Sequence, residues 1–432
     1  MSISTRLDRV LDAAVAQQRV VGAIAAVLVR GEVVYHRAVG LADREAHRAM
    51  TPGTPHRLAS LTKPVTTVAA LALVDRGVLA LDQPVTRWLP AFRPPYGDTR
   101  PTITLHHLLT HTSGLGYSFL EPPGGPLHQA GVSDGLDRPG LALDENLRRL
   151  AGVPLQCAPG TAFHYSLSTD VLGGVIERAA DAPLPEVIRR FVTGPLELPA
   201  LSFAPRTDLA TPYADGHPPY RIEEGKPVPF VAPCAVSFSP ARALDPASYP
   251  SGGAGILGTA LDFARFLDAL RTRKLASVST TSIDAMLRDQ IAPLTSDLLG
   301  PGYGYGYGVA VLRDPEVAGS TLSAGAVRWG GAYGHSWFID PGSETTSVLL
   351  TNTAFEAFKT RAMRGVIAGI IQHHFGDALD HGERRSKFMA SVREERLFAH
   401  IGIDQPRLVG VNGASQPAKF VRTRVARQSG AL

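Results

Sequence analysis

Apolar positions repeat at helical spacing at the start of the chain and in strand-like runs directly after it. Over residues 1–18 the apolar side chains fall on one helical face, at Leu7, Val10, Leu11 and Ala14. Two apolar, β-branched runs follow, residues 22–30 and 33–40, with Gly31-Glu32 between them. A glycine-containing pair between two such runs predicts a hairpin of adjacent strands.

Helical patterns then dominate until strand-like runs return after residue 300. A buried helix is predicted to start near Pro64 and to stop at Gly77, because proline fits the first helical turn and glycine is a common stop. Further helices are predicted at residues 104–110, 144–150, 168–180, 184–192, 260–267, 282–288 and 354–375. Their expected N-caps include Thr104, Ser168 and Thr259. The later strands are predicted at residues 303–311, 326–339 and 345–352.

The stretch from Phe203 to Pro250 has no long periodic segment, and prolines recur in it. Such a stretch in a compact protein is usually functional, so we expect it to form the wall or lid of a site. Strands lie at both ends of the core and helices lie in the middle. This order predicts an α/β (α+β) fold with one antiparallel sheet flanked by helices and an inserted helical domain. The expected parts are a sheet domain (1–80 and 251–376), a mainly helical domain with long loops (81–250) and a partly disordered extension (377–432).

The composition is that of an ordinary soluble globular protein, with 44% hydrophobic and 19% charged residues. The formal net charge of +4 is small, and the basic residues near the C-terminus are interpreted as a solvated end, so no nucleic-acid partner is expected. No apolar run is long enough to span a bilayer and no signal-peptide pattern opens the chain, which predicts a cytoplasmic protein without membrane contact. Cys157 and Cys234 lack metal-ligand spacing and are interpreted as free thiols, with a single disulfide as the alternative.

Candidate chemistry begins at Ser60, which stands three residues before Lys63. Residues three apart lie on the same helical face, so a lysine there can help to remove the serine proton. Free N–H groups at a helix start also favour a developing oxyanion. When the motif stands alone, a serine cap followed by a solvated lysine is the favoured interpretation of Ser-x-x-Lys. The later motifs therefore decide between the two interpretations.

Three further motifs follow in order, and with Ser60-Leu61-Thr62-Lys63 they form a family pattern. They are His111-Thr112-Ser113-Gly114-Leu115, Tyr165-Ser166-Leu167 and Trp329-Gly330-Gly331. The sequence resembles the serine β-lactamase and penicillin-binding protein superfamily, specifically its class C-like branch and the family VIII carboxylesterases within it. The resemblance spans about Leu7 to Phe375, and the joint occurrence of these motifs in this order is specific.

The resemblance implies a role for each catalytic position. Ser60 would be the acylated nucleophile and Lys63 its proton-handling partner. Tyr165 would be the base that deprotonates Ser60 and later activates water, as a phenolate stabilised by the Lys63 ammonium. The backbone N–H groups of Ser60 and Ala332 would form the oxyanion hole.

Two positions depart from the motifs of the β-lactamases. Their Tyr-x-Asn asparagine is Leu167 here, and their Lys-Thr-Gly lysine is Trp329. In β-lactamases these residues contact the amide and carboxylate of the antibiotic, so their replacement leaves acyl transfer intact and removes much of the recognition of a β-lactam. Apolar walls suit an uncharged ester. The expected substrate-binding residues are Tyr117, Leu167, Trp329, Gly330, Gly331 and His335, and the aromatic ones among them are also consistent with core packing.

Other chemistries find less support in the sequence. His107 and His111 stand four apart, as zinc ligands on a helix do, but no metalloprotease glutamate accompanies them and a Ser-Gly turn follows. Structural or turn histidines are the favoured interpretation. No Gly-x-Ser-x-Gly elbow and no dinucleotide or phosphate-loop glycine pattern is present. No cofactor and no metal is therefore expected.

These features predict a serine hydrolase that works through an acyl-enzyme, best described as a carboxylesterase on small-molecule, short-acyl esters. A β-lactamase or D-Ala-D-Ala peptidase-like hydrolase and an acyltransferase on the same site are the alternatives. A non-catalytic binding protein on this scaffold is a further alternative, but such a module has no need of Ser60, Lys63 and Tyr165 together.

Overall fold

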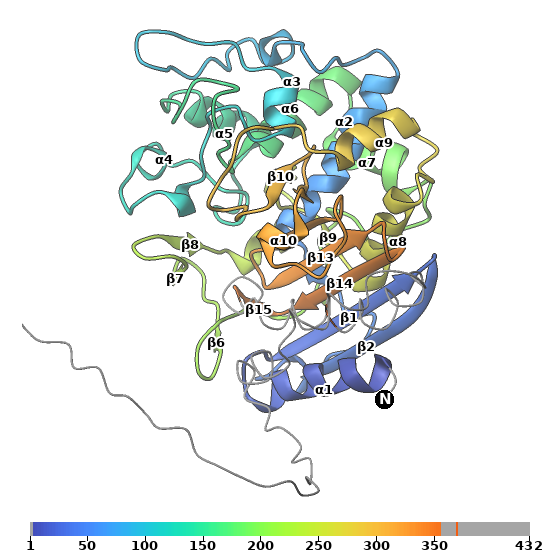
Figure 1. Ribbon diagram of the computed structural model, residues 1–432. Helices are drawn as coiled ribbons and strands as arrows, with labels where there is room; N and C mark the ends of the chain where they lie inside the picture. The colour runs from blue at the N-terminus through green and yellow to red at the C-terminus, as the bar shows by residue number, and fades with distance from the viewer. Residues whose placement is uncertain (1–2, 356–368, 370–432) are drawn as a thin grey trace, which may run out of the picture.

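One antiparallel sheet of eight strands is the centre of the computed structural model, which describes residues 3–355 and residue 369 (Figure 1). The strand order is β10-β11-β12-β13-β14-β1-β2-β3. β1 (Gly22–Val29) pairs with β14 (Thr345–Thr351), with Ala23 opposite Thr351 and Val29 opposite Thr345. Strands from residues 22–49 and 303–351 thus share one sheet, which confirms the predicted fold class. The other strands are β2 (Glu32–Asp43), β3 (Arg48–Ala49), β10 (Tyr303–Tyr305), β11 (Ala310–Leu312), β12 (Val327–Gly331) and β13 (His335–Asp340).

Helices cover both faces of this sheet. α1 (Ile3–Ala16) packs on β2 and lies below the sheet in the view of Figure 1. Its buried residues include the four apolar positions that predicted the helix: Leu7, Val10, Leu11 and Ala14. α8 (Ala260–Arg271), capped by Thr259 as expected, packs on β14 and β1. An amphipathic stripe on each helix therefore meets an apolar sheet face.

α2 (Thr62–Asp75) is the most buried helix near the middle of the molecule, and it packs against α6 and α7. All of its residues from Thr62 to Leu73 are buried, as expected for the Ala-rich run. The remaining helices of the described chain are α3 (Leu105–Leu109), α4 (Pro126–Gln129), α5 (Leu143–Leu150), α6 (Ser168–Ala180), α7 (Leu184–Ile188), α9 (Thr280–Leu287) and α10 (Pro315–Ala318). Short 3-10 or π segments are η1 (Ala59–Leu61), η2 (Val85–Arg87), η3 (Ser118–Leu120), η4 (Arg189–Thr193) and η5 (Pro240–Leu244). The division into a sheet domain and a helical domain stays a prediction.

Several local expectations need correction. Ser168 is the first residue of α6, and the cap position belongs to Leu167, whose side chain makes no capping hydrogen bond. The stretch from Phe203 to Pro250 contains short strands, because turns bring its apolar runs together in pairs. They are β5 (Tyr213–Ala214), β6 (Tyr220–Arg221), β7 (Pro227–Pro229) and β8 (Ala235–Ser237). β4 (His56–Arg57) pairs with β9 (Leu257–Gly258).

The C-terminal helix predicted over residues 354–375 meets the described chain at only three positions. Ala354 belongs to β15 (Thr353–Ala354), Phe355 follows it, and Gly369 is helical. The rest of that predicted helix and the extension 377–432 lie outside the described residues.

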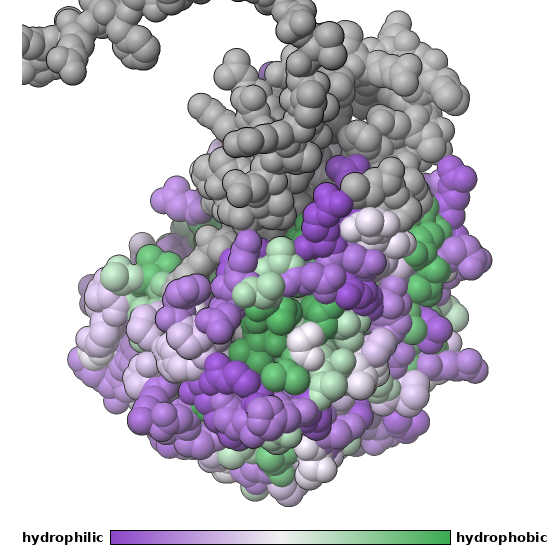
Figure 2. Space-filling view, turned by 90° about the horizontal axis from the view of Figure 1, so that it is seen from below, coloured by the Kyte–Doolittle hydropathy of each residue, from purple (hydrophilic) through white to green (hydrophobic). Residues whose placement is uncertain are grey.

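The described surface is mostly hydrophilic when the molecule is seen from below, with a group of hydrophobic residues near its centre (Figure 2). Large apolar side chains that are exposed come from separate elements: Val33, Tyr96, Leu120, Tyr220, Val231, Leu244, Leu298 and Val317. Within residues 3–355, no helix combines the length and the apolar character that crossing a membrane requires. The cytoplasmic location stays a prediction.

Two adjacent buried histidines make stability depend on pH. His56 of β4 and His335 of β13 stand edge to face, 5.7 Å between ring centroids. Burial lowers the pKa of His56 to about 3 and that of His335 to about 4. Both rings are therefore neutral in the folded protein at pH 5 and protonated in the unfolded chain.

We expect the folded protein to lose stability as the pH falls from about 6.5 toward 4, because only the unfolded chain then takes up protons on these two histidines. Each histidine contributes about 1.4 kcal/mol per pH unit in that window. The measurement is urea unfolding of the wild type and of His56→Asn at pH 6 and pH 5, since other titrating groups cancel in the difference. The wild type should lose about 1.4 kcal/mol more than the variant over that unit. Parallel profiles would contradict this account.

Candidate active site

Ser60 is presented by a strained turn at the start of the buried helix. It lies in η1, two residues before α2 begins at Thr62, so a short 3-10 turn precedes the expected helix. The preceding Ala59 is fully buried and has a φ of 48°, a left-handed conformation that is costly for a residue with a Cβ. Ser60 itself is partly exposed. The turn therefore points a hydroxyl toward solvent from an otherwise buried segment.

Two side chains donate to the Ser60 hydroxyl oxygen, and a third donates to one of those two. The Tyr165 O–H donates to Ser60 Oγ at 2.6 Å, across a separation of 105 residues. The Lys63 Nζ donates to the same oxygen at 3.1 Å. The Trp329 Nε1–H donates in turn to the Tyr165 oxygen at 3.2 Å. The structure thus brings together all three residues that the sequence analysis named as catalytic, and adds an indole donor.

Lys63 is fully buried and is held in place from two sides. Its Nζ also donates to the carbonyl oxygen of Gly253 at 2.9 Å. It lies 4.7 Å from the centre of the Tyr165 ring and 5.3 Å from that of Tyr117, within range of a cation–π attraction. The ammonium is therefore enclosed by polar and aromatic partners and is aimed at Ser60.

The segment 252–256, whose Gly253 carbonyl accepts the Lys63 hydrogen bond, is also bonded to threonine side chains of α2. Thr66 Oγ1 donates to the Gly252 carbonyl at 2.8 Å, and Thr62 Oγ1 accepts the Ile256 N–H at 3.0 Å. A Cβ on Gly252 would lie 2.6 Å from the Thr169 carbonyl oxygen, so only glycine allows α6 to approach this closely. The sequence analysis missed this role. The Gly252-Gly253-Ala254-Gly255 run was the available signal, since clustered glycines mark close backbone approach.

Asp170 of α6 lies behind the same segment. Its Oδ1 accepts the Ser251 hydroxyl at 2.6 Å, and a Cβ on Gly253 would lie 2.4 Å from its Oδ2. Burial raises the pKa of this carboxyl, and the Lys63 ammonium opposes that rise. Asp170 therefore packs closely against Gly253, whose carbonyl oxygen accepts the Lys63 hydrogen bond.

Strand β12 brings its glycines against the turn that carries Ser60. Gly330 and Gly331 are buried, and a Cβ on Gly331 would lie 2.8 Å from the Leu58 carbonyl oxygen. The next residue, Ala332, packs against the same apolar cluster as Ala59. The Ala332 backbone is thereby carried beside Ser60, which suits the expected oxyanion hole.

Aromatic side chains form the apolar surroundings of the catalytic groups. Tyr117 is buried and stacks on Phe119 at 4.6 Å between ring centroids. Phe119 meets Phe230, at the end of β7, edge to face at 6.3 Å. Phe119, Phe230 and Ala332 are partly buried and pack on the cluster that contains Ala59. Phe230 is thus linked to Tyr165 through Phe119 and Tyr117, and the role of the stretch after Phe203 as a site wall stays a prediction.

Two expected substrate-binding residues do not offer their side chains to a ligand in this structure. Leu167 is fully buried in the main core, and its backbone N–H donates to the Gly116 carbonyl. His335 is fully buried as well, with Nε2 bonded to the Arg57 carbonyl at 2.9 Å and Nδ1 accepting the Thr351 N–H at 3.3 Å. Both ring nitrogens are thus used inside the protein. We assign neither side chain a contact with substrate.

The groups around the Ser60 hydroxyl suit nucleophilic catalysis. No group of three histidine, cysteine or carboxylate side chains within the described chain is placed to hold a metal ion.

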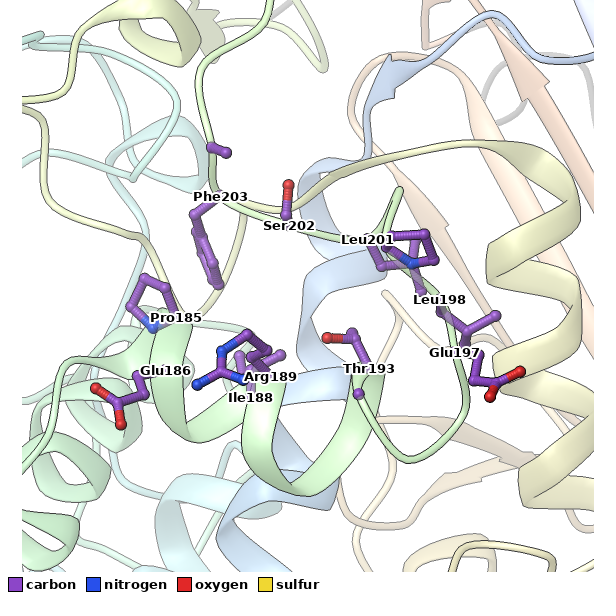
Figure 3. Close-up of a pocket in the computed structure, with 13 residues that line it drawn as sticks. Pro185, Glu186, Ile188, Arg189, Thr193, Glu197, Leu198, Leu201, Ser202 and Phe203 are labelled. Atoms are coloured by element: carbon purple, nitrogen blue, oxygen red, sulfur yellow. The ribbon is translucent and has the colours of Figure 1, made fainter.

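A cavity of about 790 Å³ lies away from Ser60, between α7, η4 and the segment that ends at Ala204 (Figure 3). Its lining includes Arg189, Leu198 and Phe203 but none of the residues that meet at Ser60. It is therefore separate from the candidate active site.

Comparison with known proteins gives consistent relatives. The family model described as Beta-lactamase matches residues 7–370. Esterase EstB of Burkholderia gladioli is 49% identical over 375 residues, which cover 85% of this chain and 95% of that protein. Lovastatin esterase of Penicillium rubens is 27% identical, covering 77% of this chain and 89% of that protein. The solved structure described as "EstCE1, a hydrolase with promiscuous acyltransferase activity" superposes with a TM-score of 0.81 and 39% identity, covering 85% of this chain and 98% of that one.

Proposed function

The chain belongs to the β-lactamase family, and from that premise we propose that it is a serine esterase that cleaves small-molecule carboxylic esters through an acyl-enzyme on Ser60. The observation that carries this proposal is the convergence of Tyr165 and Lys63 on one hydroxyl, at 2.6 Å and 3.1 Å. A serine whose proton has two nearby polar partners is the arrangement that nucleophilic catalysis requires.

The proposed cycle uses these groups in turn. With Tyr165 as phenolate, its oxygen takes the Ser60 proton while Oγ attacks the ester carbonyl. The Trp329 N–H donates to that oxygen, and the Lys63 Nζ lies 4.7 Å from the centre of the Tyr165 ring. The N–H groups of Ser60 and Ala332 stabilise the tetrahedral oxyanion. The proton then passes to the leaving alcohol, and a water activated by Tyr165 releases the acid.

The substrate class follows from the surroundings of Ser60. Trp329 stands where the β-lactamases of this family have a lysine, and its indole N–H is engaged with Tyr165 rather than free for a carboxylate. Phe119 and Phe230, which are partly buried, supply apolar surface, and the buried Tyr117 packs behind Phe119. Uncharged esters with a short acyl group therefore fit this site better than anionic β-lactams or D-Ala-D-Ala peptides.

Acyl transfer is a second candidate that one comparison favours. The solved relative EstCE1 is described as a hydrolase with promiscuous acyltransferase activity. The same acyl-enzyme would serve transfer, provided that an alcohol displaces water at the partly exposed Ser60. Ester hydrolysis in the presence of added methanol, with methyl ester formation measured, separates the two outcomes.

We expect p-nitrophenyl acetate and butyrate to be turned over at least about 10³-fold more efficiently, in kcat/KM, than a chromogenic cephalosporin, since the site lacks the lysine that β-lactamases offer. The measurement is steady-state hydrolysis of all three substrates by the same preparation. Restoring the family's lysine in Trp329→Lys provides a matched comparison, which should shift the ratio toward the cephalosporin. Dominant cephalosporin turnover by the wild type would instead support the β-lactamase alternative.

A further inference from the structure

The motif His111 to Leu115 has no part in the proposed cycle. Its first residue, His111, nevertheless accepts hydrogen bonds from the residue before and the residue after Tyr165. The His164 N–H donates to the His111 carbonyl oxygen at 2.8 Å. The Ser166 N–H donates to His111 Nδ1 at 3.2 Å. One histidine thus holds the backbone on both sides of Tyr165. The Tyr165 side chain has little freedom to shift without breaking one of these bonds.

The His111 ring also contacts Tyr165 directly. The two ring centroids are 4.9 Å apart, and the rings of Tyr305 and Phe163 approach His111 at 5.4 Å and 6.0 Å. His111 is fully buried within these three aromatic rings. The ring therefore serves as packing surface for the side chain whose hydroxyl meets Ser60.

The bonding pattern defines which form of the ring is present. Nδ1 accepts the Ser166 N–H and also lies 3.2 Å from Ser166 Oγ, whose hydroxyl can donate to it. We therefore assign the proton of the neutral ring to Nε2, which has no nitrogen or oxygen partner within the described chain. Burial, with the nearby Lys63 ammonium, holds the pKa of His111 well below its usual range. A proton on Nδ1 would face the Ser166 N–H and break the hydrogen bond between them.

The backbone of His111 has a conformation that is unfavourable for most side chains, which indicates a specific requirement for the side chain at this position. Its φ is 54°, a left-handed conformation that few side chains other than glycine and asparagine adopt readily. Three serine hydroxyls add to these contacts. Ser166 Oγ bonds Ser168 Oγ at 2.8 Å, and Ser168 Oγ bonds Ser113 Oγ at 2.8 Å. The motif and the Tyr165 segment thus form one buried polar network.

From these contacts we propose that His111 is a positioning residue for Tyr165, which it holds through the Ser166 N–H and through ring contact. The inference rests on the proposed function, in which Tyr165 is the base. A shift of about 1 Å in a catalytic group costs about 10²-fold in rate. Loss of the Nδ1 acceptor should therefore lower kcat rather than substrate binding.

Two replacements separate the acceptor from the bulk of the ring. His111→Asn places an amide oxygen near the position of Nδ1 and tolerates the left-handed backbone. His111→Gln carries its amide farther out, near the position of Nε2, and leaves the Ser166 N–H unpaired. His106→Asn is the matched control, because His106 bonds the Tyr307 hydroxyl and not the Tyr165 segment. kcat and KM for p-nitrophenyl butyrate and thermal unfolding are measured for each.

We expect kcat to stay within about fivefold of the wild type in His111→Asn and His106→Asn, and to fall about 30- to 100-fold in His111→Gln with KM within about threefold. If His111→Gln does not fold, His111→Gly, which accepts the positive φ but has no acceptor, replaces it. Equal kcat values in the Asn and acceptor-free variants would overturn the positioning role. Full activity of Tyr165→Phe would instead remove the premise that Tyr165 is the base, so the two failures are distinguishable.

Discussion

Replacing Ser60 with alanine is expected to reduce ester hydrolysis by at least about 10⁴-fold, because no other group can form the acyl-enzyme. The hydroxyl accepts hydrogen bonds from Tyr165 and Lys63 and is the one atom that both contact. The substitution removes a single oxygen from a partly exposed position, so the fold should be preserved. The measurement is p-nitrophenyl acetate and butyrate hydrolysis together with fluorophosphonate labelling detected by intact-protein mass spectrometry.

Ser202→Ala is the matched control for this experiment. Ser202 is also partly buried but lines the separate cavity, so its variant should keep wild-type activity and labelling. Labelling of the wild type at Ser60, and its absence in Ser60→Ala, would support a covalent mechanism and argue against a non-catalytic binding protein. Ester hydrolysis that persists in Ser60→Ala would refute the mechanism built on this residue.

Replacing Tyr165 with phenylalanine is expected to lower kcat about 10³-fold with little change in KM. The ring stays in its contacts with Trp329, Tyr117 and His111, so substrate binding and packing are preserved. Only the hydroxyl 2.6 Å from Ser60 Oγ is lost, and a positioned general base contributes about 10²- to 10⁴-fold. Steady-state kinetics with p-nitrophenyl butyrate and the rate of the initial p-nitrophenol burst report the two steps separately.

Tyr305→Phe provides the control for the loss of a buried tyrosine hydroxyl nearby. The Tyr305 ring contacts Trp329, and its hydroxyl has no hydrogen-bond partner within the described residues. Its removal should leave kcat within about twofold, since an unpaired buried hydroxyl contributes nothing to hold the site. A Tyr165→Phe variant as active as Tyr305→Phe would assign the base to another group, with Lys63 as the nearest candidate.

Most of the regular elements could be predicted because their signals are local. The apolar face of α1, the Gly31 hairpin and the caps of α3 and α8 depend on side chains a few residues apart. The errors are of the kind that local patterns produce. Ser168 is a residue type that often caps helices, but α6 begins at Ser168 itself and Leu167 occupies the cap position. The short strands after Phe203 are too brief to leave a period.

The candidate site divides in the same way. The spacing of Ser60 and Lys63 is local, and a single helical turn is enough to place them on one face. Tyr165 and Trp329 could be named only through the resemblance of their motifs. No local pattern predicts that Tyr165 bonds Ser60 across 105 residues, or that Trp329 bonds Tyr165 across 164. The Gly253 carbonyl, 190 residues from Lys63, carried no chemical signal of its own.

By itself, then, the sequence determined the elements, the family resemblance and the candidate nucleophile, since each depends on neighbouring residues or on a motif. The tertiary structure decided which groups surround Ser60. Packing of α6 onto α2 through Gly252 sets the Lys63 acceptor, and the register of β12 sets the Trp329 donor. It also decided that Leu167 and His335 are interior residues, because burial depends on what the rest of the chain places over a side chain. Contacts across long separations arise from the packing of whole elements, which no local pattern encodes.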